Sequence, residues 1–149
     1  MRKLILLAED NPDDILLTQK AFQKSNILNE LIVVKNGKEA LDFLFCEGQF
    51  KDRDCKHMPE LILLDLKMPK IDGLEVLKQI RDNKRTKHLP VVILTTSKEE
   101  NDMIASYCLG ANSYITKPVD FNQFVTAVEQ LGLYWLVLNQ KPQIEGCQE

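Results

Sequence analysis

Five side chains of this 149-residue chain could together carry out phosphoryl transfer. Glu9 and Asp10 follow one short apolar run, and Asp65 follows another. Thr95 and Lys117 each follow a further short segment that is typical of a strand. Three crowded carboxylates repel one another unless a hard divalent cation such as Mg²⁺ neutralises them. A lysine ammonium and a threonine hydroxyl can hold phosphoryl oxygens, while an aspartate acts as the nucleophile that accepts the group.

The elements that precede these residues must bring them together. Apolar or β-branched runs alternate with segments of helical periodicity along the chain. Strands are expected at 3–8, 30–35, 61–64, 91–94 and 113–116, and helices at 13–25, 39–45, 74–83, 98–109 and 121–138. This alternation predicts an α/β fold with a doubly wound parallel sheet and right-handed crossovers. Ligands of such sheets bind beyond the carboxyl ends of the strands, where all five side chains fall.

Composition limits the class of protein. The length suits a single domain, and 44% hydrophobic residues can form a sizeable core. The formal net charge of −3, from 19 basic and 22 acidic residues, argues against binding to nucleic acid. The longest apolar run has six residues (133–138), whereas about 20 are needed to span a bilayer. We therefore expect a cytoplasmic protein with neither a nucleic-acid nor a membrane partner.

The cysteines and the less regular segments suggest little chemistry. The four cysteines are Cys46, Cys55, Cys108 and Cys147. None belongs to a C-x-x-C pair, so they are expected to be free thiols in a reducing compartment.

Residues 46–60 are interpreted as a long polar loop on a single domain that spans 1–139. The remaining residues, 140–149, are expected to form a loose tail.

Four motifs resemble, in order and spacing, those of response-regulator receiver domains over about residues 3–132. They are Leu7-Ala-Glu-Asp-Asn-Pro12, Leu63-Leu-Asp-Leu-Lys-Met-Pro69 with Asp72-Gly73, Leu94-Thr-Thr-Ser97, and Gly110-Ala-Asn-Ser-Tyr-Ile-Thr-Lys-Pro118. The resemblance implies a five-stranded, flavodoxin/CheY-like sheet with strand order 2-1-3-4-5. It also implies a two-component response regulator, a phosphoacceptor switch and not an enzyme, that takes a phosphoryl group from a histidine kinase and assists its own phosphorylation and dephosphorylation.

The resemblance assigns Mg²⁺ and the phosphoryl group to particular residues. Asp65 would be the phosphoacceptor. It would also bind Mg²⁺ together with Glu9, Asp10 and the backbone carbonyl of Lys67. Lys67 and Ser97 would occupy the two variable positions that tune dephosphorylation.

Further residues are implied in the switch itself. Thr95 and Lys117 would contact the phosphoryl group, and the peptide bond before Pro118 would be cis. Tyr114 would turn inward when Thr95 moves. This motion would reshape the face formed by the helix at 98–109, the strand at 113–116 and the last helix.

A narrower likeness is to stand-alone receivers that partner phytochrome-type sensor histidine kinases. It rests on the long loop before 61–64, on Ala105-Ser-Tyr and on Tyr134-Trp-Leu. The segment 133–138 is apolar on every side, and it could fold back on its own domain or be exposed. Because no output module is expected, we predict a homodimer or a docking site formed by Tyr134, Trp135 and Leu136.

Three other functions fit the sequence less well. A phosphatase of the haloacid-dehalogenase kind needs Asp-x-Asp, but Lys67 occupies the second acidic position. A nucleotide or flavin binder of similar fold needs a glycine-rich phosphate-binding motif, and the chain has none. A non-phosphorylated pseudo-receiver that only binds proteins would be expected to lack part of the acidic site, whereas every part is present.

Overall fold

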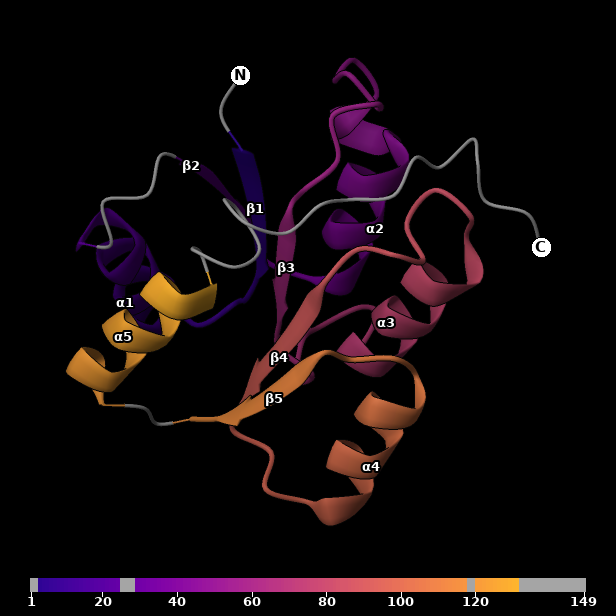
Figure 1. The fold of residues 1–149 in the computed structure, drawn as a ribbon. Helices are drawn as coiled ribbons and strands as arrows, with labels where there is room; N and C mark the ends of the chain where they lie inside the picture. The colour runs from indigo at the N-terminus through magenta and orange to yellow at the C-terminus, as the bar shows by residue number, and fades with distance from the viewer. Residues whose placement is uncertain (1–2, 25–28, 118–119, 132–149) are drawn as a thin grey trace.

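The computed structural model of the chain describes residues 3–24, 29–117 and 120–131. Within these ranges, five strands alternate with five α-helices (Figure 1). The strands are β1 (Lys3–Ala8), β2 (Asn29–Val34), β3 (Leu61–Leu64), β4 (Val91–Thr95) and β5 (Ser113–Thr116). The helices are α1 (Pro12–Lys24), α2 (Gly37–Phe45), α3 (Gly73–Asp82), α4 (Glu100–Cys108) and α5 (Phe121–Leu131), with a 3₁₀ turn, η1 (Gly48–Phe50), before β3.

The strands form one parallel sheet in the order β2-β1-β3-β4-β5. This confirms the predicted doubly wound fold and its strand order. The chain moves outward from β1 to β2 and then returns to place β3 on the other side of β1. The direction of winding therefore reverses between β1 and β3, and ligands of open α/β sheets bind at the carboxyl ends of such a strand pair.

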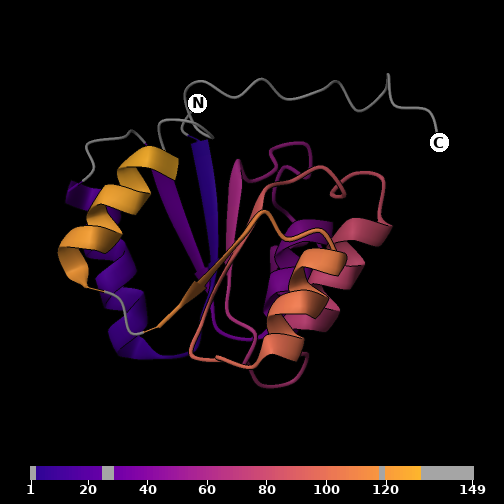
Figure 2. The ribbon, with the colours of Figure 1, turned by 60° about the horizontal axis from the view of Figure 1, so that its bottom comes forward.

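Helices cover both faces of the sheet. Figure 2 shows α1 and α5 side by side on one face, and α2, α3 and α4 on the other. Alternate residues of β1 serve the two layers, because Ile5 and Leu7 belong to the α1/α5 core while Leu6 belongs to the other. Burial on both faces explains why the three central strands are apolar except at Lys3 and Thr95, whereas β5 at the edge is only half-buried.

Four helices start at side chains that cap their first turn. In each of them a side-chain oxygen accepts a hydrogen bond from the backbone N–H three residues further on, over 2.8–3.1 Å; the capping residues are Asn11, Asn36, Asp72 and Asp120. At Gly73, an added Cβ would collide with the backbone carbonyl of Asp65. The Asp-Gly pair before α3 therefore both starts this helix and lets it approach the end of β3.

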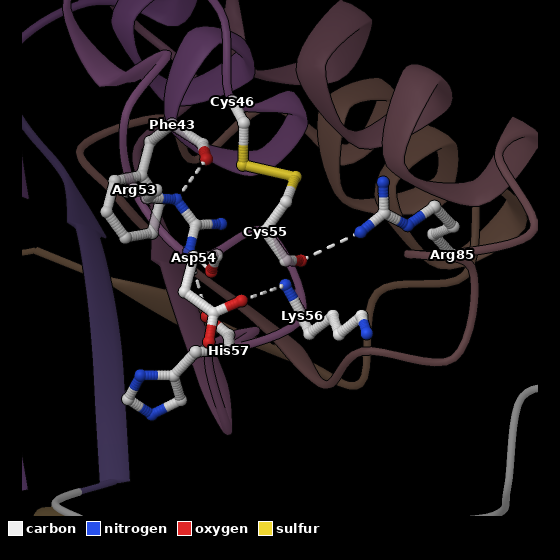
Figure 3. The surroundings of a disulfide bond; sticks show 8 residues. All are labelled: Phe43, Cys46, Arg53, Asp54, Cys55, Lys56, His57 and Arg85. Atoms are coloured by element: carbon white, nitrogen blue, oxygen red, sulfur yellow. Dashed lines mark hydrogen bonds between the residues drawn. A yellow bond between two sulfur atoms is a disulfide. The ribbon is translucent and has the colours of Figure 1, made fainter.

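The loop between α2 and β3 departs from the prediction. Cys46 and Cys55 form a disulfide, with their Cα atoms 5.8 Å apart (Figure 3). The prediction of free thiols was wrong for this pair. Cys46 adopts a left-handed conformation at the end of α2, and η1 then turns the chain back, so two cysteines nine residues apart meet. Cys108 is exposed and not in a disulfide, and Cys147 lies outside the described residues.

Arginines fasten this loop to its surroundings. The Arg53 Nε atom donates to the Phe43 carbonyl over 2.7 Å, and the guanidinium lies over the Phe43 ring at 4.0 Å (Figure 3). Phe43 in turn meets Phe50 edge-on, with ring centroids 5.1 Å apart. Arg85, beyond α3, donates to the Cys55 carbonyl over 2.8 Å. The predicted long polar loop is thus a folded segment that a disulfide and arginine hydrogen bonds hold to the rest of the domain.

Some predictions fall on residues that are not described. These are the tail at 140–149, the end of the predicted last helix and the apolar segment 133–138. Across the described ranges, every helix is too short or too polar to cross a membrane.

Candidate phosphoacceptor site

Hydrogen bonds that extend the sheet ladder hold two of the three predicted carboxylates, Glu9 and Asp65, at the ends of β1 and β3. The Glu9 N–H donates to the Val34 carbonyl over 2.9 Å, and the Asp65 N–H donates to the Ala8 carbonyl over 3.1 Å. Carboxylate oxygens of Glu9, Asp10 and Asp65 all lie within 4.8 Å of one another. Glu9 and Asp65 are 1% and 5% exposed, whereas Asp10 is open to solvent.

Lys117 joins this cluster from the end of β5. Its Nζ atom lies 2.6 Å from Glu9 Oε1, 2.8 Å from Asp14 Oδ2 and 3.2 Å from Asp65 Oδ2. An ammonium has three donors, and all three are directed at carboxylates. The Lys117 side chain is 6% exposed, so it is a buried cation surrounded by anions.

Asp14, on α1, was missed as a site residue by sequence reasoning. It was interpreted only as an acid that favours a helix N-terminus, which it also is. Its place in the first turn of α1, directly after the loop that carries Asp10, was the available signal. The contact with Lys117 spans 103 positions of sequence, so it depends on how α1 and β5 meet in the fold.

Burial and charge shift the pKa values of the paired groups. Burial raises the pKa of Glu9 from 4.5 to about 7, and the charge of Asp65 adds to this, although the hydrogen bond from Lys117 opposes it. Burial alone would lower the pKa of Lys117. The hydrogen bonds to Asp14 and Glu9 outweigh it, and they raise the pKa of Lys117 above its ordinary value. Lys117 is therefore charged, while Glu9 is poised to exchange a proton near neutral pH.

Thr95 lies on the neighbouring strand, and its backbone is tied to that of Lys117. The Lys117 N–H donates to the Thr95 carbonyl over 2.7 Å. Thr95 is fully buried, and its hydroxyl oxygen accepts a hydrogen bond from the Ser97 N–H over 3.3 Å. The Tyr114 hydroxyl donates to the Ser97 carbonyl over 3.0 Å. A continuous set of contacts thus leads from Thr95 to the half-buried ring of Tyr114.

A second acidic contact lies on the outer side of the site. Asp102 of α4 accepts a hydrogen bond from the Ser97 hydroxyl over 2.6 Å and lies 3.6 Å from the Lys67 ammonium. The Lys67 N–H donates to Asp65 Oδ1 over 3.1 Å. The two predicted tuning positions, Lys67 and Ser97, therefore meet at a carboxylate that sequence reasoning did not single out.

Comparison with known proteins identifies this arrangement. The family model for the response regulator receiver domain matches residues 5–129. The chain belongs to the response regulator receiver domain family. The phosphatase of the haloacid-dehalogenase kind and the nucleotide or flavin binder are thereby set aside.

Three relatives resemble the receiver over most of its length. Response regulator Rcp1 from Synechocystis is 42% identical over 134 residues, covering 90% of this chain and 89% of Rcp1. The Mn²⁺-bound crystal structure of Rcp1 superposes with a TM-score of 0.82, at 41% identity over 95% of this chain and 99% of that one. The phosphorylated cyanobacterial phytochrome response regulator RcpA gives a TM-score of 0.84, at 40% identity over 96% and 100% of the two chains. The bacteriophytochrome response regulator RtBRR gives 0.79, at 51% identity over 95% and 85%.

The receiver is thus a response regulator of two-component signalling, a class that works with histidine kinases and is not made of classical enzymes. Receiver domains bind Mg²⁺, and the carboxylate cluster of this chain suits such a cation. Its donors are hard oxygens from three residues, and the exposed Asp10 leaves one side open to the waters that Mg²⁺ retains.

Several implied features of the receiver remain predictions. Pro118 lies outside the described residues, as do Tyr134, Trp135 and Leu136. The described contacts of Lys67 involve its backbone N–H and its ammonium, so a cation-binding role of its carbonyl also stays a prediction.

Proposed function

We propose that Asp65 accepts a phosphoryl group from a phosphohistidine of a sensor kinase. One observation carries the proposal. Asp65 is nearly buried, yet its carboxylate lies within 4.8 Å of two other carboxylates and 3.2 Å from the Lys117 ammonium. Clustering charges at the end of a buried strand costs folding free energy, and such clusters are commonly found at functional sites.

The proposed reaction is an in-line displacement at phosphorus. An Asp65 oxygen forms a bond to phosphorus while the bond between phosphorus and the histidine nitrogen breaks, and the electron pair leaves with the imidazole. In the return reaction a water oxygen attacks phosphorus, Asp65 regains its carboxylate, and inorganic phosphate departs. Such transfers depend on positioning and charge neutralisation more than on covalent help from the protein. In this sense the receiver assists its own phosphorylation and dephosphorylation.

Glu9, Asp10, Asp65 and the Lys67 carbonyl are the groups that would hold Mg²⁺. When bound, the cation would neutralise charge shared between these carboxylates and the phosphoryl oxygens. Among the described residues, Lys117 supplies the only positive charge in contact with Glu9 and Asp65. The buried ammonium therefore keeps the carboxylates together before the phosphoryl group arrives.

The signal would leave through the contacts that join Thr95 to Tyr114. A phosphoryl group on Asp65 brings new acceptor oxygens, to which the Thr95 hydroxyl and the Lys117 ammonium would donate. A shift of Thr95 would disturb the hydrogen bond that its hydroxyl accepts from the Ser97 N–H. It would thereby also move the Ser97 carbonyl, which accepts the hydrogen bond from the Tyr114 hydroxyl. The ring of Tyr114 would then repack between α4 and β5, changing the face formed by α4, β5 and α5.

The kinase partner that we propose is of the phytochrome type. The support is similarity of at least 40% to regulators named for phytochromes, over nearly the whole chain. We extend the proposal to a homodimer, or a docking site for a downstream protein, through Tyr134, Trp135 and Leu136. Light scattering before and after phosphorylation tests this extension, and an unchanging monomer that still relays the signal would contradict the dimer.

The central proposal is tested by treating the protein with acetyl phosphate and Mg²⁺ and following its intact mass. We expect one phosphoryl adduct that hydroxylamine releases, as it does from acyl phosphates, and that EDTA prevents from forming. Asp65→Asn removes the nucleophile and should abolish the adduct. Asp52→Asn, which neutralises an exposed aspartate of the loop between α2 and β3, is the matched control and should retain it. An adduct that persists in Asp65→Asn would refute the assignment.

A further inference from the structure

The carboxylate of Asp102 links two loops of the site to α4. One of its oxygens, Oδ2, accepts the Ser97 hydroxyl over 2.6 Å and lies 3.6 Å from Lys67 Nζ. Ser97 belongs to the loop after β4, and Lys67 to the loop after β3. The Asp102 side chain is 17% exposed and lies in the first turn of α4, where the helix N-terminus favours a negative charge. It is therefore a charged, partly buried anchor for both loops.

Lys67 has two anions within reach of its long side chain. Its backbone N–H is bonded to Asp65 Oδ1 over 3.1 Å, so the side chain begins beside the phosphoacceptor. Its ammonium instead lies next to Asp102, at the rim of a cleft of about 420 Å³. The cleft is lined by Leu66, Lys67, Met68, Asp72, Leu74 and Asp102. Because the Lys67 side chain is 58% exposed on this cleft, it has room to swing between the two anions.

We propose that Asp102 is a positioning residue that competes with the phosphoryl group for Lys67 and Ser97, and thereby sets how long the phosphoryl group stays on Asp65. The inference rests on the proposed function of Asp65. In the unphosphorylated protein Asp102 holds the Lys67 ammonium and the Ser97 hydroxyl. A protein-bound phosphoryl group carries nearly two negative charges, so it attracts the same two donors once it is present.

The direction of the effect follows from where Lys67 goes. An ammonium paired with the phosphoryl oxygens stabilises the phosphorylated state, and the four-carbon stem covers the approach of water. Hydrolysis requires a water oxygen to bond to phosphorus as the bond to the Asp65 oxygen breaks, with the electron pair returning to the carboxylate and a proton released to solvent. Asp102 draws Lys67 away from this approach. Removing its charge should therefore slow the loss of phosphate.

Asp102→Asn is the variant that isolates the charge, because asparagine keeps an oxygen that can accept the Ser97 hydroxyl. The phosphorylated protein is freed of acetyl phosphate, and the decay of the adduct is followed by intact mass. Since the Lys67–Asp102 pair is partly exposed, we expect a moderate effect, a half-life about fivefold longer than in the wild type. In a Lys67→Gln background the same substitution should leave the half-life unchanged, because no ammonium remains to be redirected.

Asp82→Asn is the matched control, since it removes one negative charge from an exposed pair with Lys78 on α3, and it should decay like the wild type. A half-life in Asp102→Asn equal to that of the wild type would overturn the inference. So would a longer half-life that persists unchanged with Lys67→Gln, because this would assign the effect to α4 packing and not to Lys67. Absence of any adduct on wild-type Asp65 would instead refute the proposed function, so the two failures are distinguishable.

Discussion

The pocket around Asp65 and the loop that follows α2 lie at opposite ends of β3, and different forces hold them. In the pocket, the Lys117 ammonium contacts three carboxylates from β1, α1 and β3. The loop is held by a disulfide and by hydrogen bonds to neutral backbone carbonyls, such as the bond from Arg53 to the Phe43 carbonyl. The first arrangement changes whenever a charge is added or removed. The loop does not depend on the protonation of its partners, because backbone carbonyls and a disulfide do not titrate.

The difference separates switching from support. Adding a divalent cation or a phosphoryl group to the pocket gives Lys117 and the carboxylates new partners of comparable strength. The loop has no alternative partners of this kind. Its cross-link is covalent, and the contact between the Phe43 and Phe50 rings is stabilised by packing and not by charge. Under the proposed function, one end of the sheet would rearrange during signalling, while the other end fixes the start of β3.

Removal of the buried ammonium should produce the largest effect. Lys117→Met leaves Glu9 and Asp65 as neighbouring buried carboxylates without their cation. We expect the free energy of unfolding at pH 7 in EDTA to fall by about 3–5 kcal/mol, measured by urea denaturation. Lys38→Met is the control, because Lys38 forms a pair with Asp42 at 2.9 Å but is 58% exposed, and its loss should change the free energy of unfolding far less. Equal losses in the two variants would contradict the view that the pocket depends on charge.

The pH dependence of stability should be the next largest effect. The pKa of Glu9 is raised from 4.5 to about 7 in the folded protein, so the folded state binds a proton more tightly than the unfolded state does. This contribution is fully present below pH 4.5 and is lost as the pH rises to about 7. As the pH rises from 4.5 to about 7, the free energy of unfolding of the metal-free wild type should therefore fall by about 3 kcal/mol relative to that of Glu9→Gln. Urea denaturation of both proteins in EDTA across this range measures it, and parallel pH profiles would contradict it.

Much of the pocket could be predicted from the sequence, because its residues follow apolar runs that could only be neighbouring parallel strands. Glu9, Asp65 and Lys117 meet as expected once β1, β3 and β5 share one sheet. Apart from the end of the last helix, which lies outside the described residues, the elements also begin and end within about two residues of their predicted limits. Strand ends are informative in this fold because the topology sends them all to one edge of the sheet.

The misses have a common physical cause. Asp14 and Asp102 join the site because of how their helices are oriented relative to neighbouring loops and strands. Hydrophobic periodicity shows which face of a helix is buried, but not which polar residues of that helix contact a neighbour. The pairing of Cys46 with Cys55 depends on a left-handed residue and a 3₁₀ turn inside a polar stretch. Pairing depends on the distance between Cα atoms, which cysteine spacing alone does not give.

The smallest expected effect on stability comes from the disulfide-bonded loop between α2 and β3. Replacing Cys46 and Cys55 by serine removes a cross-link over a sequence separation of nine. Releasing a loop of this length in the unfolded chain should lower the free energy of unfolding by about 2–3 kcal/mol in urea denaturation, and dithiothreitol should reproduce the loss in the wild type. Cys108→Ser, at an exposed cysteine outside the disulfide, is the control and should have no effect. If the two ends of the sheet are independent, the phosphoryl half-life at Asp65 should be the same in the double variant and in the wild type. A changed half-life would mean that the start of β3 transmits strain to its end, and the division into a rearranging end and a fixed end would fail.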